Sequence, residues 1–269
     1  MDLRPIDLDH TLSCGQAFRW RRTGQTWMGV VEGMSVRLEQ RGRRMEVETE
    51  LPDSRIESYF RADDDYESII KEISKEPYVA SLVRRFPGLR LLRQDPWECS
   101  ASYILATFSN IPRIKGMIER VCALYGEEIE PGLHAFPEPR SISENGARAE
   151  TCGLGFRCQR FIEFATRVDR GGVDFEGLKG SSYEEAHRSL VELEGIGDKV
   201  ADCIAVFSLD HLEAFPIDVR IGRTLKERYG VSGRYGKVSA FARSHFGPYA
   251  GYSQEFIYYA MDRKNIGPG

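Results

Sequence analysis

The first fifty residues alternate between apolar and polar positions with the period of a β-strand. Met34, Val36 and Leu38 alternate with polar neighbours, and Met45 and Val47 do the same. A glycine follows a polar residue wherever a hairpin turn would join such strands, in the pairs Thr23-Gly24, Glu32-Gly33 and Arg41-Gly42. We therefore expect an antiparallel meander, covered on one face by later helices.

From Leu51 onward the apolar positions recur at helical spacing, and the starts of helices carry capping signals. Asp95-Pro96 combines an N-cap acid with a proline at the first helical position. The spacing of a capping box appears in Ser54 with Glu57 and in Ser181 with Glu184. Residues 131–139, rich in proline and glycine, are expected to form a surface connection.

These patterns predict an α+β fold. We expect an N-terminal domain over residues 1–92, with an antiparallel β-sheet and flanking helices. A mostly helical body of two subdomains would follow over residues 93–269, and it would contain a helix–hairpin–helix motif with its hairpin at residues 193–199.

Composition describes a globular chain with no membrane segment. Hydrophobic residues make up 41% and charged residues 29% of the 269 positions. The longest apolar runs, such as residues 203–207, are too short to span a bilayer. The chain starts without a basic segment followed by an apolar one, so we expect a cytoplasmic protein, nucleoid-associated in a prokaryote, or a nuclear one in a eukaryote.

Charge is distributed unevenly along the chain, although the net charge is only −4. Residues 216–237 contain two acids and these basic residues: Arg220, Arg223, Lys226, Arg228, Arg234 and Lys237. A basic end on an acidic body is compatible with a face that binds DNA, and equally with solvated surface. Charge alone leaves both interpretations open.

Neither the cysteines nor the histidines show the spacing of a metal site. The chain has six cysteines without a C-x-x-C pair, and its five histidines form no H-E-x-x-H motif. We expect reduced thiols, no metal and no cofactor.

The strongest chemical signal lies between residues 181 and 228. A helix is expected over residues 182–192, followed by a turn with Gly195 and Gly197, and a second helix from Lys199. Two glycines one residue apart permit a tight turn whose backbone amides face outward at a helix N-terminus, where they can bind a phosphate. Glycines also serve purely structural corners between helices, so this pattern alone is weak.

Lys199 and Asp218 add specificity to that turn. The positive end of the helix dipole at Lys199 favours the neutral, nucleophilic amine, but a solvated lysine or one directed at a phosphate is the commoner case. Asp218 is either the N-cap of the next helix or an acid that faces the lysine across a cleft.

The combined motifs resemble a known family. The sequence LEGIGDKVADC at residues 193–203, followed by PIDV at residues 216–219, resembles the helix–hairpin–helix (HhH-GPD) DNA glycosylases. CGQAFRW at residues 14–20, QDPWEC at residues 94–99 and CGLGFR at residues 152–157 are similar to the 8-oxoguanine DNA glycosylase/lyase branch. The resemblance covers nearly the whole chain. The chain also lacks the C-terminal cysteine quartet of the iron–sulfur branches.

The resemblance implies a catalytic pair and a base pocket. Lys199 would attack C1′ of a flipped nucleotide to form a Schiff base that permits β-elimination, and Asp218 would stabilise the developing positive charge. Metal and cofactor would be absent. The residues implied for the base pocket are Gly15, whose carbonyl would accept the N7 proton of 8-oxoguanine, Gln254 on the Watson–Crick edge, and Cys203 and Tyr258 on the two faces. Taken singly, Cys203 and Tyr258 are equally compatible with ordinary core positions.

The resemblance also implies contacts with the rest of the duplex. Arg113 and Arg157 would contact the estranged cytosine and Phe156 would form the wedge. Gly195, Gly197 and Arg220 would contact phosphates. Phe108 stands where the family has the asparagine that fills the gap left by the flipped base, and this departure removes a hydrogen bond to cytosine. Arg220 stands where the family commonly has a histidine that contacts phosphate. The compact length and these two substitutions indicate a prokaryotic or archaeal member.

The expected activity is therefore a bifunctional DNA glycosylase/AP lyase for 8-oxoguanine and related oxidised purines in base excision repair. The expected partner is duplex DNA with 8-oxoguanine opposite cytosine, bound by a monomer without a membrane. The alternatives are a glycosylase for other damaged bases and a noncatalytic DNA-binding module that kept the hairpin. Lys199 argues against a monofunctional glycosylase for alkylated bases, because these enzymes lack the lysine.

Overall fold

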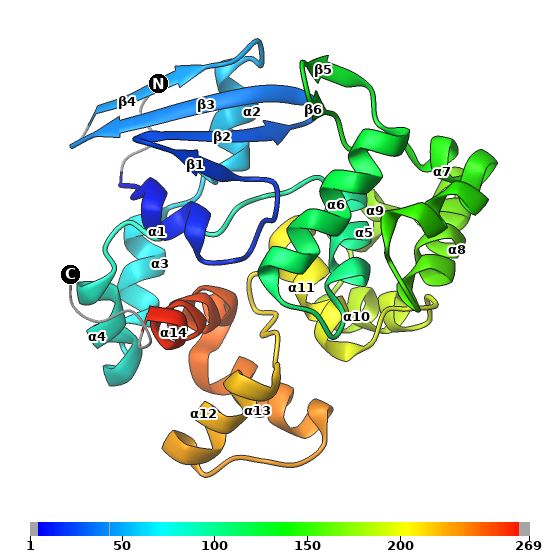
Figure 1. The fold of residues 1–269 in the computed structure, drawn as a ribbon. Coiled ribbons are helices and arrows are strands. Elements are labelled where there is room, and N and C mark those ends of the chain that lie inside the picture. Colours follow the sequence, from blue (N-terminus) through cyan, green and yellow to red (C-terminus); the bar gives the residue numbers. More distant parts are fainter. Residues whose placement is uncertain (1–4, 43, 264–269) are drawn as a thin grey trace.

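A computed structural model describes residues 5–42 and 44–263, and in it an N-terminal sheet is followed by a mostly helical body (Figure 1). The elements in chain order are α1 (Leu8–Ser13), β1 (Arg21–Thr23), β2 (Thr26–Val31), β3 (Met34–Arg41), β4 (Arg44–Glu48), α2 (Asp53–Tyr59), α3 (Tyr66–Ile73), α4 (Pro77–Arg85), α5 (Pro96–Ala106), α6 (Ile111–Tyr125), β5 (Glu128–Glu130), β6 (Leu133–His134), α7 (Pro139–Asn145), η1 (Gly146–Cys152), α8 (Arg157–Asp169), α9 (Phe175–Gly180), α10 (Tyr183–Val191), α11 (Asp198–Ser208), α12 (Val219–Tyr229), α13 (Tyr235–Phe246), η2 (Gly247–Tyr249) and α14 (Ala250–Arg263).

The predicted meander is confirmed. Strands β1 to β4 pair antiparallel with their neighbours in chain order. Glu32 and Gly33 join β2 to β3 with φ values of +49° and +77°, the left-handed pair that a two-residue hairpin turn requires. The α+β class is therefore correct, with the sheet formed from local hairpins.

One face of the sheet is buried beneath the first two helices. Val36 and Leu38 of β3 are fully buried, whereas Met34 at the start of the strand is 42% exposed. These strand residues share a hydrophobic cluster with Leu8 and Leu12 of α1 and with residues of α2. The period-2 pattern therefore identified the core face of the central strand but not the exposure at its end.

A second, larger hydrophobic cluster holds the helices together. It includes α5, α6, α8, α10, α11 and α14, and also α3 and α4, which precede residue 92 in the chain. The last helix, α14, packs against α3 and α4, so segments far apart in the chain lie side by side (Figure 1). The division at residue 92 stays a prediction.

The capping signals were partly wrong. Asp95 caps α5 as expected, with its carboxylate 2.8 Å from the amide of Glu98. The capping box of α10, however, is formed by Ser182 and Glu185, one residue later than predicted. Helix α2 begins after Pro52 with no side-chain cap, so Ser54 does not cap it. Sequence spacing located helix starts to within a residue or two.

The short antiparallel pair β5–β6 was not predicted, and it falls at the start of the proline-rich connection over residues 131–139.

Within the described part of the chain, every helix is too short or too polar to cross a bilayer.

Candidate functional site

The glycine turn forms a true hairpin between α10 and α11. Gly195 has a φ of +87°, and a Cβ there would lie 3.1 Å from the Cβ of Arg160 on α8, so glycine is required. Gly197 is exposed and is the N-cap of α11, with open space around the position of a Cβ. No side chain caps α11, which begins at Asp198, one residue before the predicted start. The first amides of α11 can therefore donate to an anion that approaches over Gly197.

Lys199 lies in the first turn of α11 and is partly buried against aromatic and sulfur groups. Its Nζ is 5.0 Å from the centroid of the Tyr103 ring on α5. It hydrogen-bonds to Cys203, one helical turn further on. Burial raises the pKa of the Cys203 thiol to about 11, although the charge of Lys199 opposes this. The lysine therefore has an uncharged thiol and an aromatic face as neighbours.

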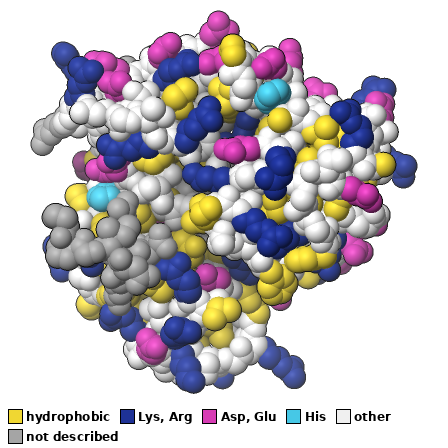
Figure 2. All heavy atoms as spheres, viewed as in Figure 1, with side chains coloured by type: hydrophobic (Ala, Val, Ile, Leu, Met, Phe, Trp, Pro, Cys, Tyr) yellow, Lys and Arg dark blue, Asp and Glu magenta, His cyan; other side chains and the backbone are white. Residues whose placement is uncertain are grey.

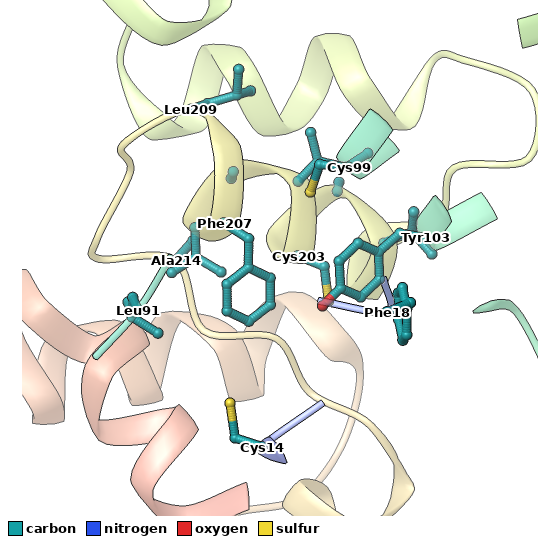
Figure 3. Close-up of a cluster of buried hydrophobic side chains, with 14 of the residues drawn as sticks. Cys14, Phe18, Leu91, Cys99, Tyr103, Cys203, Phe207, Leu209 and Ala214 are labelled. Atoms are coloured by element: carbon teal, nitrogen blue, oxygen red, sulfur yellow. The ribbon is translucent and has the colours of Figure 1, made fainter. Parts of the chain in front are cut away.

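Figure 3 shows the surroundings of Cys203 and Tyr103. Cys203 and Tyr103 lie beside one another, with Phe18 next to the tyrosine ring and Cys14 on a separate segment. The rings of Phe18 and Tyr103 meet edge to face at 5.4 Å, and Tyr103 stacks on Phe207 at 5.7 Å. These contacts fix the orientation of the ring over which Lys199 lies.

Asp218 is the N-cap of α12. Its carboxylate accepts a hydrogen bond of 2.7 Å from the amide of Ile221, so the cap interpretation is confirmed. The backbone just before it is tied to α11, because the amide of Ile217 donates to the Tyr235 hydroxyl and that hydroxyl donates to Asp202. Asp202 lies three residues after Lys199, so this bridge couples the segments that carry the two candidate catalytic groups.

One predicted pocket residue, Tyr258, lies beside Gly15. The φ of Gly15 is +96°, and a Cβ there would lie 3.0 Å from Ile111 Cδ1 and 3.8 Å from Tyr258 Cε1. Tyr258 is partly buried on α14, with the guanidinium of Arg220 5.1 Å from its ring centroid. One turn earlier on the same helix, Gln254 is 5% exposed, and within the described residues its Oε1 has no hydrogen-bond partner. A buried polar atom of this kind is available to a ligand.

The sequence analysis did not single out Glu255 and Cys14, two buried residues next to Gln254 and Gly15 in the chain. Glu255 is 2% exposed, directly follows Gln254, and hydrogen-bonds to the Cys14 side chain. Burial raises its pKa to about 7, while Cys14 and the charge of Lys199 lower it. The available signal was a glutamate inside the otherwise uncharged stretch SQEFIYYA at residues 253–260.

The predicted wedge, Phe156, and the residue predicted at the gap left by the flipped base, Phe108, form an exposed aromatic pair. Phe108 is 89% exposed with a φ of +49°, Phe156 is 54% exposed, and their ring centroids are 6.3 Å apart. Two neighbouring aromatic rings this exposed are unusual on the surface of a globular protein. Arg160 links them to the hairpin, because its guanidinium lies over Phe156 and its Cβ lies beside Gly195. The pair is available to insert into a partner.

The two predicted cytosine-contacting arginines differ in environment. Arg113 is exposed at the start of α6. Arg157 is only 2% exposed, and its guanidinium donates to the carbonyls of Thr107, Phe108 and Leu154. Burial lowers the pKa of Arg157, and the nearby charge of Arg113 adds to this effect. In this structure Arg157 supports the backbone that presents Phe108.

The charge asymmetry of the sequence is visible on the surface. In Figure 2 acidic side chains gather along the upper edge, while Lys and Arg side chains lie across the middle and at the lower edge, where Figure 1 places α12 and α13. The described residues contain no group of three or more His, Cys, Asp or Glu side chains arranged for a metal ion. The expected absence of a metal stays a prediction.

Comparison with solved structures concerns the fold first. A solved structure of a 3-methyladenine DNA glycosylase from Archaeoglobus fulgidus superposes with a TM-score of 0.75 over 97% of this chain and 95% of that one, at 19% identity. At that identity the likeness concerns the fold alone.

More specific similarities narrow the class. Residues 1–99 match the family described as 8-oxoguanine DNA glycosylase, N-terminal domain. The N-glycosylase/DNA lyase OGG1 of Arabidopsis thaliana is 27% identical over 95% of this chain and 79% of its own length. The Clostridium acetobutylicum 8-oxoguanine glycosylase/lyase, solved with duplex DNA containing cytosine opposite 8-oxoguanine, is 30% identical, with a TM-score of 0.90 over 97% of this chain and 93% of that one. The chain belongs to the 8-oxoguanine DNA glycosylase branch of the HhH-GPD superfamily.

Proposed function

We propose that this protein is a bifunctional DNA glycosylase and AP lyase that removes 8-oxoguanine from duplex DNA in base excision repair. The observation that carries the proposal is Lys199, a partly buried amine at the N-terminus of the hairpin helix, held between Tyr103 and Cys203. A module that only bound DNA would need the backbone amides of the hairpin but not a partly buried amine between Tyr103 and Cys203. Membership of the family supports the same activity.

The chemistry assigned to Lys199 is nucleophilic. Its amine attacks C1′ of the flipped nucleotide, the bond to the base breaks, and the resulting Schiff base permits β-elimination of the 3′ phosphate. Asp218 stabilises the positive charge that develops on the sugar. Since Asp218 also caps α12, its carboxylate is held in one orientation by the amide of Ile221.

The pocket around Gly15 would recognise the base. The carbonyl of Gly15 would accept the N7 proton that 8-oxoguanine has and guanine lacks, because guanine would leave two acceptors facing one another. The free Oε1 of Gln254 would accept from the Watson–Crick edge. Cys203 and Tyr258 would cover the two faces of the purine.

The exposed aromatic pair and the hairpin would hold the distorted duplex. Phe156 would wedge the helix open and Phe108 would stack in the vacated position, where a phenyl ring cannot hydrogen-bond to cytosine. Arg113 would contact the cytosine directly, and Arg157 would act through the backbone of Phe108. Gly195, Gly197 and Arg220 would contact the phosphates of the lesion strand.

We further propose that the enzyme acts as a monomer without a cofactor. It would work in the compartment that holds the DNA, which is the cytoplasm of a prokaryote or the nucleus of a eukaryote. A glycosylase for another damaged base remains the alternative that a panel of alkylated and oxidised duplexes would reveal.

Borohydride trapping tests the proposal. On a duplex with 8-oxoguanine opposite cytosine, the wild type should give a covalent complex, and Lys199→Gln should give none while base release falls by at least about 100-fold. Lys237→Gln, which neutralises an exposed lysine on α13, is the matched control and should be trapped like the wild type. Unchanged base release by Lys199→Gln would refute the mechanism. Absence of trapping with the wild type would indicate a different lesion or a DNA-binding module.

A further inference from the structure

A cavity lies between the N-terminal sheet and helix α6, and the chemistry described above does not use it. Its volume is about 380 Å³. The sheet domain contributes residues 18–21 and 28–29, and the β5–β6 turn contributes residues 132–134. The other wall is formed by side chains of α6 between residues 115 and 123.

The lining of this cavity is basic. Arg19, Arg21, Lys115 and Arg120 line it, and Glu119 is the acid among its described lining residues. Figure 2 shows basic side chains around an acidic one near the middle of the face, beside the region where Figure 1 shows α6. Cations that share one cavity repel each other, so a negatively charged ligand is favoured there.

The basic side chains have donors left for such a ligand. Nζ of Lys115 donates to the Trp20 carbonyl at 2.6 Å, and Nε of Arg120 donates to the Cys152 carbonyl at 2.8 Å. An ammonium and a guanidinium each carry further N–H donors. Arg21 is exposed on β1, and within residues 5–42 and 44–263 its side chain makes no hydrogen bond or ion pair.

Arg19 is a nearly buried cation with a weak internal partner. Its side chain is 10% exposed, and Nη2 donates to the His134 carbonyl. Nη1 lies 3.7 Å from Oε2 of Glu98, which is longer than a hydrogen bond, and it has no hydrogen-bond partner in the described part of the chain. A buried donor in this state lowers stability, and an anion in the cavity would offset part of that loss.

The cavity adjoins the elements proposed to contact the duplex. Arg113, Gly116 and Arg120 recur on one face of α6 at helical spacing. The helix rises about 10 Å from Arg113 to Arg120, which is the length of about three nucleotides of one strand. Arg120 also bonds to Cys152, at the start of the turn that leads to Phe156.

We propose that this cavity is a second DNA contact, in which a backbone phosphate of the duplex outside the lesion binds to Arg21, Lys115 and Arg120. The inference rests on the proposed function, because the ligand is the same duplex. Guanidinium and ammonium groups bind phosphate oxygens through charge-assisted hydrogen bonds and do not read the base sequence. The N-terminal sheet thereby takes part in DNA binding, and the contact adds affinity without sequence preference.

The salt dependence of DNA binding tests this contact. The probe is a duplex with a tetrahydrofuran abasic analogue, which lacks the C1′ hydroxyl and cannot form a Schiff base. In fluorescence anisotropy over a series of KCl concentrations, Arg21→Gln should weaken binding by about fivefold. It should also lower the slope of log K against log salt by about 0.9, the value for one phosphate contact. Because Arg21 is exposed, the variant should fold like the wild type.

Arg22→Gln is the matched control. Arg22 is the next residue on β1, is also exposed, and pairs with Asp9 at 2.8 Å instead of lining the cavity. The two variants change the net charge by the same amount, so only Arg21→Gln should alter the affinity and the salt slope. Equal losses in both variants would overturn the inference, as would wild-type binding by Arg21→Gln.

Duplex length separates a direct contact from a general effect of charge. One flank of the duplex is shortened stepwise while the other keeps a full helical turn, and the series is then repeated on the other side. On one side, the difference between wild type and Arg21→Gln should vanish at the length that no longer reaches the cavity. A difference that persists to the shortest duplex on both sides would overturn the inference.

Free phosphate is the other source of the same chemistry. Thermal unfolding is compared in inorganic phosphate and in chloride at equal ionic strength. Stabilisation by phosphate that Arg21→Gln abolishes, together with an unchanged salt slope for DNA, would assign the cavity to a free anion and overturn the DNA contact. An unchanged slope with normal trapping by Lys199 refutes only this contact. Absence of trapping on an 8-oxoguanine duplex refutes the proposed function, and the length series still decides the contact.

Discussion

At the scale of single residues, Gly15 leaves little room for a side chain in the candidate pocket. Its φ of +96° lies where side chains are rarely found, and the space that a Cβ would need is limited by Ile111 and Tyr258. The same backbone presents the carbonyl proposed to distinguish 8-oxoguanine from guanine. The backbone conformation at Gly15 and the proposed recognition of 8-oxoguanine therefore both depend on the absence of a Cβ at this position.

Gly15→Ala should reduce excision of 8-oxoguanine by about 100-fold, because a displacement of about 1 Å at a recognition atom has this effect. Stability should fall by about 1–2 kcal/mol from the unfavourable backbone conformation. Gly24→Ala is the control, since Gly24 also has a positive φ, +63°, but has nothing within 4 Å of a Cβ. Single-turnover excision and thermal unfolding of both variants check this. An equal loss of excision in both variants would contradict the pocket assignment.

At the scale of elements, the position of α11 relative to the segment before α12 is set by a small polar network. Asp202 is fully buried and accepts hydrogen bonds from Tyr183 at 2.6 Å and from Tyr235 at 2.5 Å. The Tyr235 hydroxyl also accepts from the amide of Ile217 at 3.2 Å. Helices α10, α11 and α13 are thereby joined to the backbone that leads into Asp218.

Tyr235→Phe should slow Schiff-base formation by about tenfold while lowering the free energy of unfolding by about 1–3 kcal/mol, because a buried carboxylate loses a donor. Tyr66→Phe is the matched control. The Tyr66 hydroxyl is buried and donates to the carbonyl of Leu89 at 2.8 Å, away from this network. The control should lose stability and retain the wild-type trapping rate at a temperature where both variants are folded. Equal trapping rates for both variants would indicate that the network is only structural.

At the scale of the whole molecule, a cluster of ion pairs joins the N-terminal part of the chain to the helical body. Asp210, just after α11, lies 2.7 Å from Arg61, 2.9 Å from Arg93 and 2.9 Å from Lys179. Burial opposes ionisation of Asp210, but the three cations outweigh it and lower its pKa to about 2. Arg61 is 1% exposed, and its other acidic neighbour, Asp64, is 3.7 Å away, so removal of the Asp210 charge leaves a buried cation with only this longer ion pair.

Asp210→Asn should lower the free energy of unfolding at pH 7 by at least about 2 kcal/mol. The folded pKa lies below the unfolded value, so this stabilisation is present above about pH 4 and is lost as the pH falls toward 2. Asparagine tolerates the φ of +61° at this position, so the variant tests charge rather than backbone strain. Denaturant unfolding between pH 2 and 7 should therefore show a gap between wild type and variant that narrows in acid. Asp63→Asn, at an acid 60% exposed beside Arg93, should change stability by less than about 1 kcal/mol.

Much of the fold was predictable because it depends on local patterns. The alternation around Val36 and Leu38 and the glycines at the turns identified the meander. The turn at Gly195 and Gly197 located the hairpin, because positive φ and an open helix N-terminus are properties of the nearest few residues. The capping residue of α10 was not fixed by the sequence, since Ser181 and Ser182 both precede a glutamate by three residues and the structure uses Ser182.

The sequence by itself therefore determined the class of the fold, the hairpin and the candidate residues Lys199 and Asp218. Tertiary structure decided which groups lose contact with water and which charges then face one another. It buried Arg157 beneath Phe108, and it buried Glu255 on α14 next to Gln254. The burial of a side chain and its contacts with distant residues depend on segments far apart in the chain, such as α11 and α14. A local sequence pattern therefore cannot predict them.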